Sequence, residues 1–79
     1  MISEVEMKRL YWHSRRGMLE LDLILVPFVE NRLATLDEKY HNLYRELLEQ
    51  EDQDLYAWLV RRSEPPSGSL AEMVAKIIT

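Results

Sequence analysis

The sequence of 79 residues contains no cysteine, which excludes disulfide bonds, thiolate metal sites and a cysteine nucleophile. It has only two glycines, so no glycine-rich loop is present that would cradle a phosphate group. The longest apolar run, residues 23–29, is far shorter than the roughly 20 residues of a membrane-spanning helix. A short chain without these devices must be stabilised by its hydrophobic core, which favours a compact bundle of helices.

The charged residues are unevenly distributed along the chain, which has a net charge of -4. Residues 1–16 hold four basic side chains against two acidic ones, whereas acidic side chains dominate the remainder. A basic end suits an acidic partner or a phosphate-bearing ligand, but the acidic majority disfavours nucleic-acid binding. The N-terminal residues have the composition of neither a signal peptide nor a transit peptide. We therefore expect a bacterial cytoplasmic protein that binds neither nucleic acid nor a membrane.

Capping signals divide residues 1–79, which we interpret as one domain, into five helices. Ser3 with Glu6 forms a capping box that predicts a first helix over about residues 4–15, and Gly17 ends this helix. Met7, Leu10 and Tyr11 form one of two candidate inward stripes of this helix. An alternative stripe contains Trp12, so this residue belongs either to the core or to a contact surface.

A second helix is expected over about residues 19–33, where apolar residues lie almost all round the helix. Such a helix belongs in the centre of a bundle. Pro27 lies inside this segment and removes one backbone donor, so we expect a kink there rather than a break at Val26.

Three further helices follow, and each has a predicted capping residue. The predicted caps are Thr35 with Glu38, Asp52 or Asp54, and Ser69 with Glu72. The side chains expected to face inward are Leu36, Tyr40, Leu43, Tyr44, Leu47, Leu48, Leu55, Trp58, Leu59, Leu70, Met73, Val74, Ile77 and Ile78. Residues 63–68 form a loop, and no segment has the alternation of a strand. The sequence therefore predicts an all-α fold.

A search for catalytic or metal-binding groups finds no usable set. His13 and Ser14 are neighbours on one predicted helix and would point about 100° apart, so they do not form a triad. We expect His13 to be exposed to solvent. Two histidines 28 positions apart match no metal-ligand spacing, and residues 52–54 lack the glycine and the distal glutamate of a calcium loop. We therefore predict a protein that is not an enzyme and that binds no metal.

Residues 15–22 combine arginine, glycine and acidic residues around one tight turn. Arg16 and Glu20 flank this turn, so both side chains are expected to project from the same corner of the molecule. Ile24 lies on the same helical stripe as Glu20 and would be an apolar residue on a polar face. Arginine beside exposed apolar surface is typical of a protein-contact patch, but taken alone these residues are more simply explained as a well-capped turn.

The segment RLYWHSRRGMLELDLILVPFVE resembles the succinate dehydrogenase assembly factors that promote flavin attachment. The hallmark of that family is an Arg-Gly-x-x-Glu motif after the first helix, matched here by Arg16, Gly17 and Glu20. Further matches are residues 18–22, the pair Pro27-Phe28, and the Asp/Leu/Trp pattern of residues 52–59. The resemblance covers about residues 8–78, and the combination of motif, downstream segment and chain length is specific.

The resemblance implies a monomeric five-helix fold and a role without chemistry of its own. Its partner would be the flavoprotein subunit of succinate dehydrogenase, and also that of fumarate reductase; we call this subunit the client. The protein would favour the client conformation in which a histidine bonds covalently to FAD. The resemblance leaves open whether the protein itself holds FAD, but one tight turn supplies few convergent backbone donors for a pyrophosphate, so we expect no tight binding. As a mechanism consistent with this resemblance, Glu20 would bind client polar groups, Arg16 would clamp a client carboxylate or polar backbone, and Gly17 would allow close backbone approach. The predicted client-binding residues are Arg9, Trp12, Arg15, Arg16, Gly17, Glu20, Asp22 and Asp52.

Two other functions remain open at this point. An antitoxin-like regulator linked to nucleic acid would use the basic residues of the first helix, Lys8, Arg9, Arg15 and Arg16, and would shift DNA or RNA in a gel at low salt. A generic helical interaction module would contain the motif as a turn only, and would not bind the flavoprotein subunit.

Overall fold

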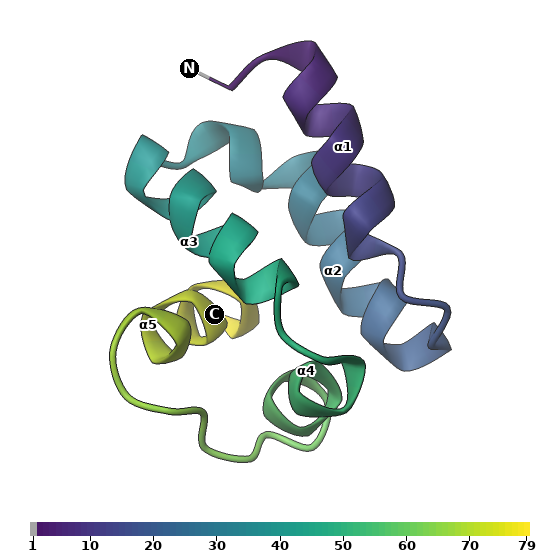
Figure 1. Ribbon diagram of the computed structural model, residues 1–79, viewed down its shortest axis with the longest axis vertical. Coiled ribbons are helices and arrows are strands. Elements are labelled where there is room, and N and C mark those ends of the chain that lie inside the picture. Colours follow the sequence, from purple (N-terminus) through teal and green to yellow (C-terminus); the bar gives the residue numbers. More distant parts are fainter. Residues whose placement is uncertain (1) are drawn as a thin grey trace.

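The computed structural model describes residues 2–79, which form five α-helices and one short 3-10 helix and contain no strand. The elements are α1 (Glu4–Ser14), α2 (Leu19–Asn31), η1 (Leu33–Thr35), α3 (Glu38–Leu48), α4 (Asp52–Leu59) and α5 (Ser69–Ile78). α1 and α2 lie side by side, α3 packs beside them, and α4 and α5 lie near one end of this group (Figure 1). The predicted all-α fold with five helices is confirmed.

The core is built by the apolar faces of all five helices and η1. Its buried members are Leu10, Leu21, Leu25, Phe28, Val29, Leu33, Tyr44, Leu47, Leu48, Leu55, Trp58, Leu59, Met73, Val74 and Ile77. Each side chain of this size contributes roughly 1.5–3 kcal/mol when it is fully buried. Met7 and Tyr11 pack partly buried against this cluster beside Leu10, so the predicted inward stripe of the first helix is confirmed.

Two polar side chains inside the core have hydrogen-bond partners. The Ser14 hydroxyl donates to the carbonyl of Leu10 at 2.6 Å and shares a hydrogen bond of 2.5 Å with the Tyr44 hydroxyl. Burial raises the pKa of Tyr44 to about 12, because the charged phenolate would lose its hydration. His41 is also buried, and its Nε2 lies 2.8 Å from the carbonyl oxygen of Leu33. These bonds remove the cost of burying polar atoms beneath α1 and α3.

The N-terminal end of α1 has the predicted cap, whereas its C-terminal end differs from the prediction. The Ser3 hydroxyl accepts a hydrogen bond from the Glu6 amide at 3.1 Å, as a capping residue should. At the other end the helix stops at Ser14, with Arg15 in an extended conformation, so Gly17 lies in the following turn and not at the helix end. Gly17 nevertheless has a φ of 82°, in the left-handed region that glycine tolerates.

The predicted capping residues of α3, α4 and α5 are wrong, because a different residue immediately precedes each helix in the structure. Asp37, Glu51 and Gly68 precede these helices, and none of the three makes a side-chain capping bond. Three of the predicted capping side chains have other partners. Thr35 lies in η1 and donates to the carbonyl of Arg32, Asp52 pairs with Arg16, and Ser69 donates to the Glu46 carboxylate. Asp54 lies within the first turn of α4, where a carboxylate favours the positive end of the helix dipole.

The second helix is less central than its composition suggested. It continues through Pro27 to Asn31, so it does not break at Val26, and Leu33 belongs to η1. One of its faces is open to solvent: the exposed fractions of Leu19 and Leu23 are 71% and 64%. The expectation of an apolar helix buried all round is therefore wrong for this face. Ile78 at the end of α5 is also exposed, although it was expected to face inward.

Candidate functional site

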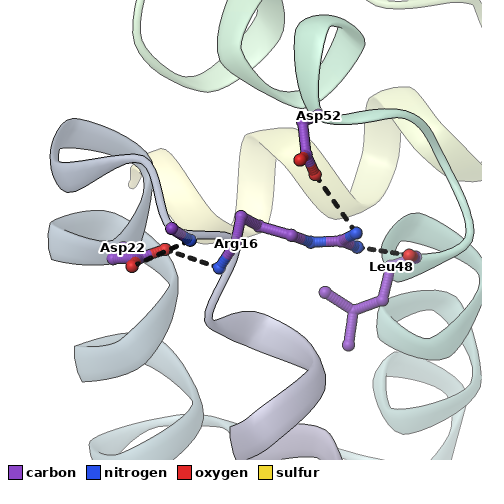
Figure 2. A network of polar contacts seen from close by, with 5 residues as sticks. Arg16, Asp22, Leu48 and Asp52 are labelled. Atoms are coloured by element: carbon purple, nitrogen blue, oxygen red, sulfur yellow. Dashed lines mark hydrogen bonds and ion pairs between the residues drawn. The ribbon is translucent and has the colours of Figure 1, made fainter.

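The turn between α1 and α2 is shaped by a carboxylate of the second helix. One oxygen of Asp22 accepts the backbone N–H of Arg16 at 2.8 Å, and the other accepts that of Gly17 at 3.3 Å (Figure 2). A Cβ atom added at Gly17 would meet no atom within 4 Å. The glycine is therefore required by the left-handed backbone rather than by crowding inside the protein, and its open side faces outward.

The side chain of Arg16 runs inward from this turn toward two other helices. Its Nη1 lies 3.3 Å from Asp52 Oδ1, and its Nη2 donates to the carbonyl of Leu48 (Figure 2). Leu48 ends α3 and Asp52 begins α4, so the guanidinium meets the negative end of one helix dipole and a carboxylate together. Only 13% of the Arg16 side chain is exposed, against 46% for Asp52.

Glu20 lies in the first turn of α2 and is exposed to solvent. Its Oε2 accepts a hydrogen bond of 2.9 Å from the Tyr56 hydroxyl of α4. This bond to a carboxylate raises the pKa of Tyr56, because it stabilises the protonated phenol. The expectation that Arg16 and Glu20 project from one corner is therefore wrong: the arginine points into the protein, where a carbonyl and a carboxylate bind it.

A shallow hollow adjoins Glu20 between the start of α2 and α4. It has a volume of about 430 Å³ and is lined by Met18, Glu20, Gln53, Tyr56, Ala57 and Arg61. The Arg61 guanidinium carbon lies 5.6 Å from the centre of the Tyr56 ring, within the range of a cation–π contact. The hollow thus combines an apolar floor with a carboxylate and a guanidinium, which suits contact with a polar protein segment.

Further exposed apolar side chains lie on α1 and α2. Trp12 is 65% exposed, which resolves its predicted ambiguity in favour of the surface. The Arg15 guanidinium carbon lies 5.6 Å from the Trp12 ring centre, and Arg15 itself is exposed. Arg15 and Asp22 line a second hollow together with the exposed side chains of Leu19 and Leu23. Large apolar residues beside arginine are typical of interface cores.

The predicted client-binding residues therefore divide into two groups. Arg9, Trp12, Arg15, Gly17 and Glu20 are exposed, whereas Arg16, Asp22 and Asp52 bind one another or the turn. Sequence reasoning missed four participants: Leu48, Tyr56, Leu19 and Leu23. The spacing of four residues in Asp52-x-x-x-Tyr56 repeats that of Arg16 and Glu20 and places both partners on one face of α4, but the spacing alone does not show which segment this face contacts.

The groups considered for chemistry are separated in the structure. Ser14 is buried with Tyr44 beneath α1, whereas His13 is exposed as predicted, so they share no site. Within residues 2–79, no cluster of three or more histidine or acidic side chains has the geometry to hold a metal ion. Nor does the described part of the chain contain a helix long and apolar enough to cross a bilayer.

This small helical protein has an arginine bound internally, an exposed glutamate and exposed apolar side chains, which are the features of a protein-binding factor. Residues 8–79 match the family model described as flavinator of succinate dehydrogenase, and the chain belongs to this family. The resemblance seen in residues 16–20 and 52–59 is therefore confirmed.

Named relatives resemble nearly the whole chain. The FAD assembly factor SdhE of Pseudomonas aeruginosa is 53% identical over 78 residues, which cover 99% of this chain and 93% of the relative. The protein of the same name from Pseudomonas savastanoi is 50% identical with the same coverage. That of Vibrio cholerae is 41% identical over 70 residues, which cover 89% of this chain and 81% of the relative.

Proposed function

We propose that this protein is an assembly factor that binds the flavoprotein subunit of succinate dehydrogenase and promotes covalent attachment of FAD to it. The observation that carries the proposal is membership of the flavinator family over residues 8–79. We extend it to the flavoprotein of fumarate reductase, and we infer that the factor acts as a monomer in the bacterial cytoplasm, without chemistry of its own.

The outward side of the α1–α2 turn is the proposed client surface. Gly17 is open on this side, so a client backbone can approach the turn closely. Glu20 retains Oε1 for a client donor, since the Tyr56 hydroxyl binds Oε2. Trp12 and Arg15, which lie against each other at the end of α1, supply an apolar and a cationic contact. Together these groups form a polar centre with an apolar rim.

Binding at this surface would act on the client rather than on the flavin directly. The bond between a client histidine and the isoalloxazine ring is chemistry of the client and its cofactor. A partner that binds the reactive arrangement of the client more tightly than other arrangements increases the population of the reactive one. The factor therefore needs a surface with differential affinity and no catalytic group.

We further infer that the factor does not hold FAD tightly on its own. A pyrophosphate group is bound by several convergent backbone donors. The amides of Arg16 and Gly17 at the turn already donate to the Asp22 carboxylate, so they are not free for a phosphate.

The direct test mixes the purified apo flavoprotein subunit with FAD, with and without this protein. We expect the subunit to be retained in a pull-down and covalent flavin to form faster in the presence of the factor, as measured by in-gel fluorescence. Equal flavinylation with and without the factor, together with no retention, would contradict the proposal. A parallel reaction with the fumarate reductase flavoprotein tests the wider client range.

Glu20→Ala tests the proposed surface. Flavinylation should fall about tenfold, because a hydrogen bond to a charged group contributes about 1.5 kcal/mol or more. Helicity and melting should change little, because the Glu20–Tyr56 bond is exposed. Tyr56→Phe is the matched control: it removes the same internal hydrogen bond and keeps the carboxylate. Equal loss of flavinylation in both variants would show that the internal bond matters, and not a client contact of Glu20.

A further inference from the structure

Two bridges connect the α1–α2 turn to α4, and their spacing matches. Arg16 and Glu20 are four residues apart, as are their partners Asp52 and Tyr56. Residues four apart lie on the same face of a helix, so α4 presents both partners to the turn. Each end of the Arg-Gly-x-x-Glu motif is therefore bound to the same face of the same helix.

The two bridges differ in their surroundings. The Arg16–Asp52 pair lies on the inner side, where the guanidinium also binds the Leu48 carbonyl and its side chain is 13% exposed. The Glu20–Tyr56 bond is exposed to solvent. A part-buried charged pair with a second acceptor fixes geometry more firmly than a single exposed hydrogen bond. The inner bridge is thus the stronger constraint on the turn.

We propose that Arg16 is a positioning residue, which holds Gly17 and Glu20 against α4 in the geometry that the client binds and does not touch the client itself. The inference rests on the proposed function. The Arg16 amide is bound by Asp22 and its guanidinium by Asp52 and Leu48, so this one residue joins α2, α3 and α4 at the turn (Figure 2). The residue that follows it is the outward-facing Gly17.

Asp52 is a positioning residue for the same reason. It is the partner that keeps the guanidinium inside, so the client affinity should depend on Asp52 as strongly as on Arg16. The opposing mechanism has Arg16 leave Asp52 and clamp a client carboxylate. In that mechanism Asp52 competes with the client for the guanidinium, and its removal leaves the affinity unchanged or raises it.

A double-mutant cycle on client binding separates the two mechanisms. The dissociation constant for the apo flavoprotein subunit is measured for the wild type, Arg16→Ala, Asp52→Ala and the double variant. We expect each single variant to bind about tenfold more weakly, and the double variant to bind no more weakly than the poorer single variant, because the two residues act as one unit. A double variant weakened by the product of the single effects, or an Asp52→Ala protein that binds at least as tightly as wild type, overturns the proposal.

A second measurement keeps the test independent of the client. Amide hydrogen exchange at positions 16 and 17, whose N–H groups donate to Asp22, should accelerate in Arg16→Ala and in Asp52→Ala alike, while the cores of α2 and α3 stay protected. Unchanged exchange at the turn overturns the positioning role. Failure of the wild type to bind the flavoprotein would instead contradict the proposed function, and the exchange data would still decide whether the inner bridge holds the turn.

The exposed ion pair between Lys39 and Glu72 provides the matched control. Its N–O distance is 2.7 Å, and it joins α3 to α5 outside the α1–α2 turn. Lys39→Ala should leave both the client affinity and the amide exchange at positions 16 and 17 unchanged. Circular dichroism of every variant at the assay temperature verifies that the helices are formed. Arg16→Lys keeps the charge but loses the planar guanidinium, so its client affinity should lie between those of the wild type and Arg16→Ala.

Discussion

The two neighbouring arginines of the α1–α2 turn have opposite surroundings. Arg15 is exposed and lies over the Trp12 ring, whereas the Arg16 guanidinium is bound by Asp52 and the carbonyl of Leu48. The extended backbone at Arg15, where α1 ends, separates their directions. The turn therefore has an inner side that fixes the structure and an outer side that is free for a partner. Charge in a motif does not by itself identify a contact residue.

Two tyrosines show the same difference between the sides. Tyr44 shares a hydrogen bond with Ser14 beneath α1, and burial raises its pKa to about 12. Tyr56 is on the outer side, where the hydrogen bond to Glu20 raises its pKa. The raised pKa of Tyr44 is coupled to folding, because the burial that causes it is lost when the core unfolds. The raised pKa of Tyr56 depends on a single exposed contact.

The largest expected effect is on the outer side, at Gly17. Gly17→Arg should weaken client binding at least about a hundredfold, because the new side chain extends outward into the space that the client must approach. Gly17→Ala is the control: both variants share the cost of a left-handed backbone, roughly 1–2 kcal/mol. Thermal melting should therefore fall equally, while a pull-down should separate them. If both lose the same binding, backbone geometry is responsible and not bulk on the outer side.

A smaller effect concerns the inner side and depends on pH. The pKa of Tyr44 is raised from 10.0 to about 12, so the unfolded state releases the proton first as the pH rises. The free energy of unfolding keeps its full contribution from Tyr44 below pH 10. It falls by about 2–3 kcal/mol between about pH 10 and 12. Urea unfolding at a series of alkaline pH values measures this loss. Tyr44→Phe should lack this part of the pH dependence, and an unchanged slope would show that Tyr44 is not its source.

Much of the fold follows from the spacing of apolar residues. The pattern of Tyr44, Leu47 and Leu48 identifies the buried face of α3, because residues three and four apart share one side of a helix. Local capping rules were less informative. Asp52 and Ser69 have the chemistry of capping residues, but Arg16 and Glu46 bind them instead. A tertiary partner far along the chain decides such cases, and local sequence does not show it.

The sequence indicated some members of the candidate site, but it missed Leu48 and Tyr56 and did not show the directions of the side chains. Gly17 and Glu20 are exposed as a contact motif requires, and Trp12 proved to be on the surface. The inward path of Arg16 depends on the end of α3 lying near the start of α4, at positions 48 and 52. That arrangement results from helix packing, so the four-residue spacing alone was insufficient to predict it.

The smallest expected effect is the titration of Tyr56 on the outer side. Its hydroxyl donates to the Glu20 carboxylate, and this bond is the main reason why its pKa is raised. Glu20→Gln replaces the anion by a neutral acceptor, so the pKa of Tyr56 should fall toward the ordinary value of tyrosine. The tyrosinate absorbance of each protein, after subtraction of the matching Tyr56→Phe variant, isolates this one phenol. A pKa that stays raised in Glu20→Gln would mean that Glu20 does not bind Tyr56 in solution, and the outer bridge to α4 would then be absent from the free protein.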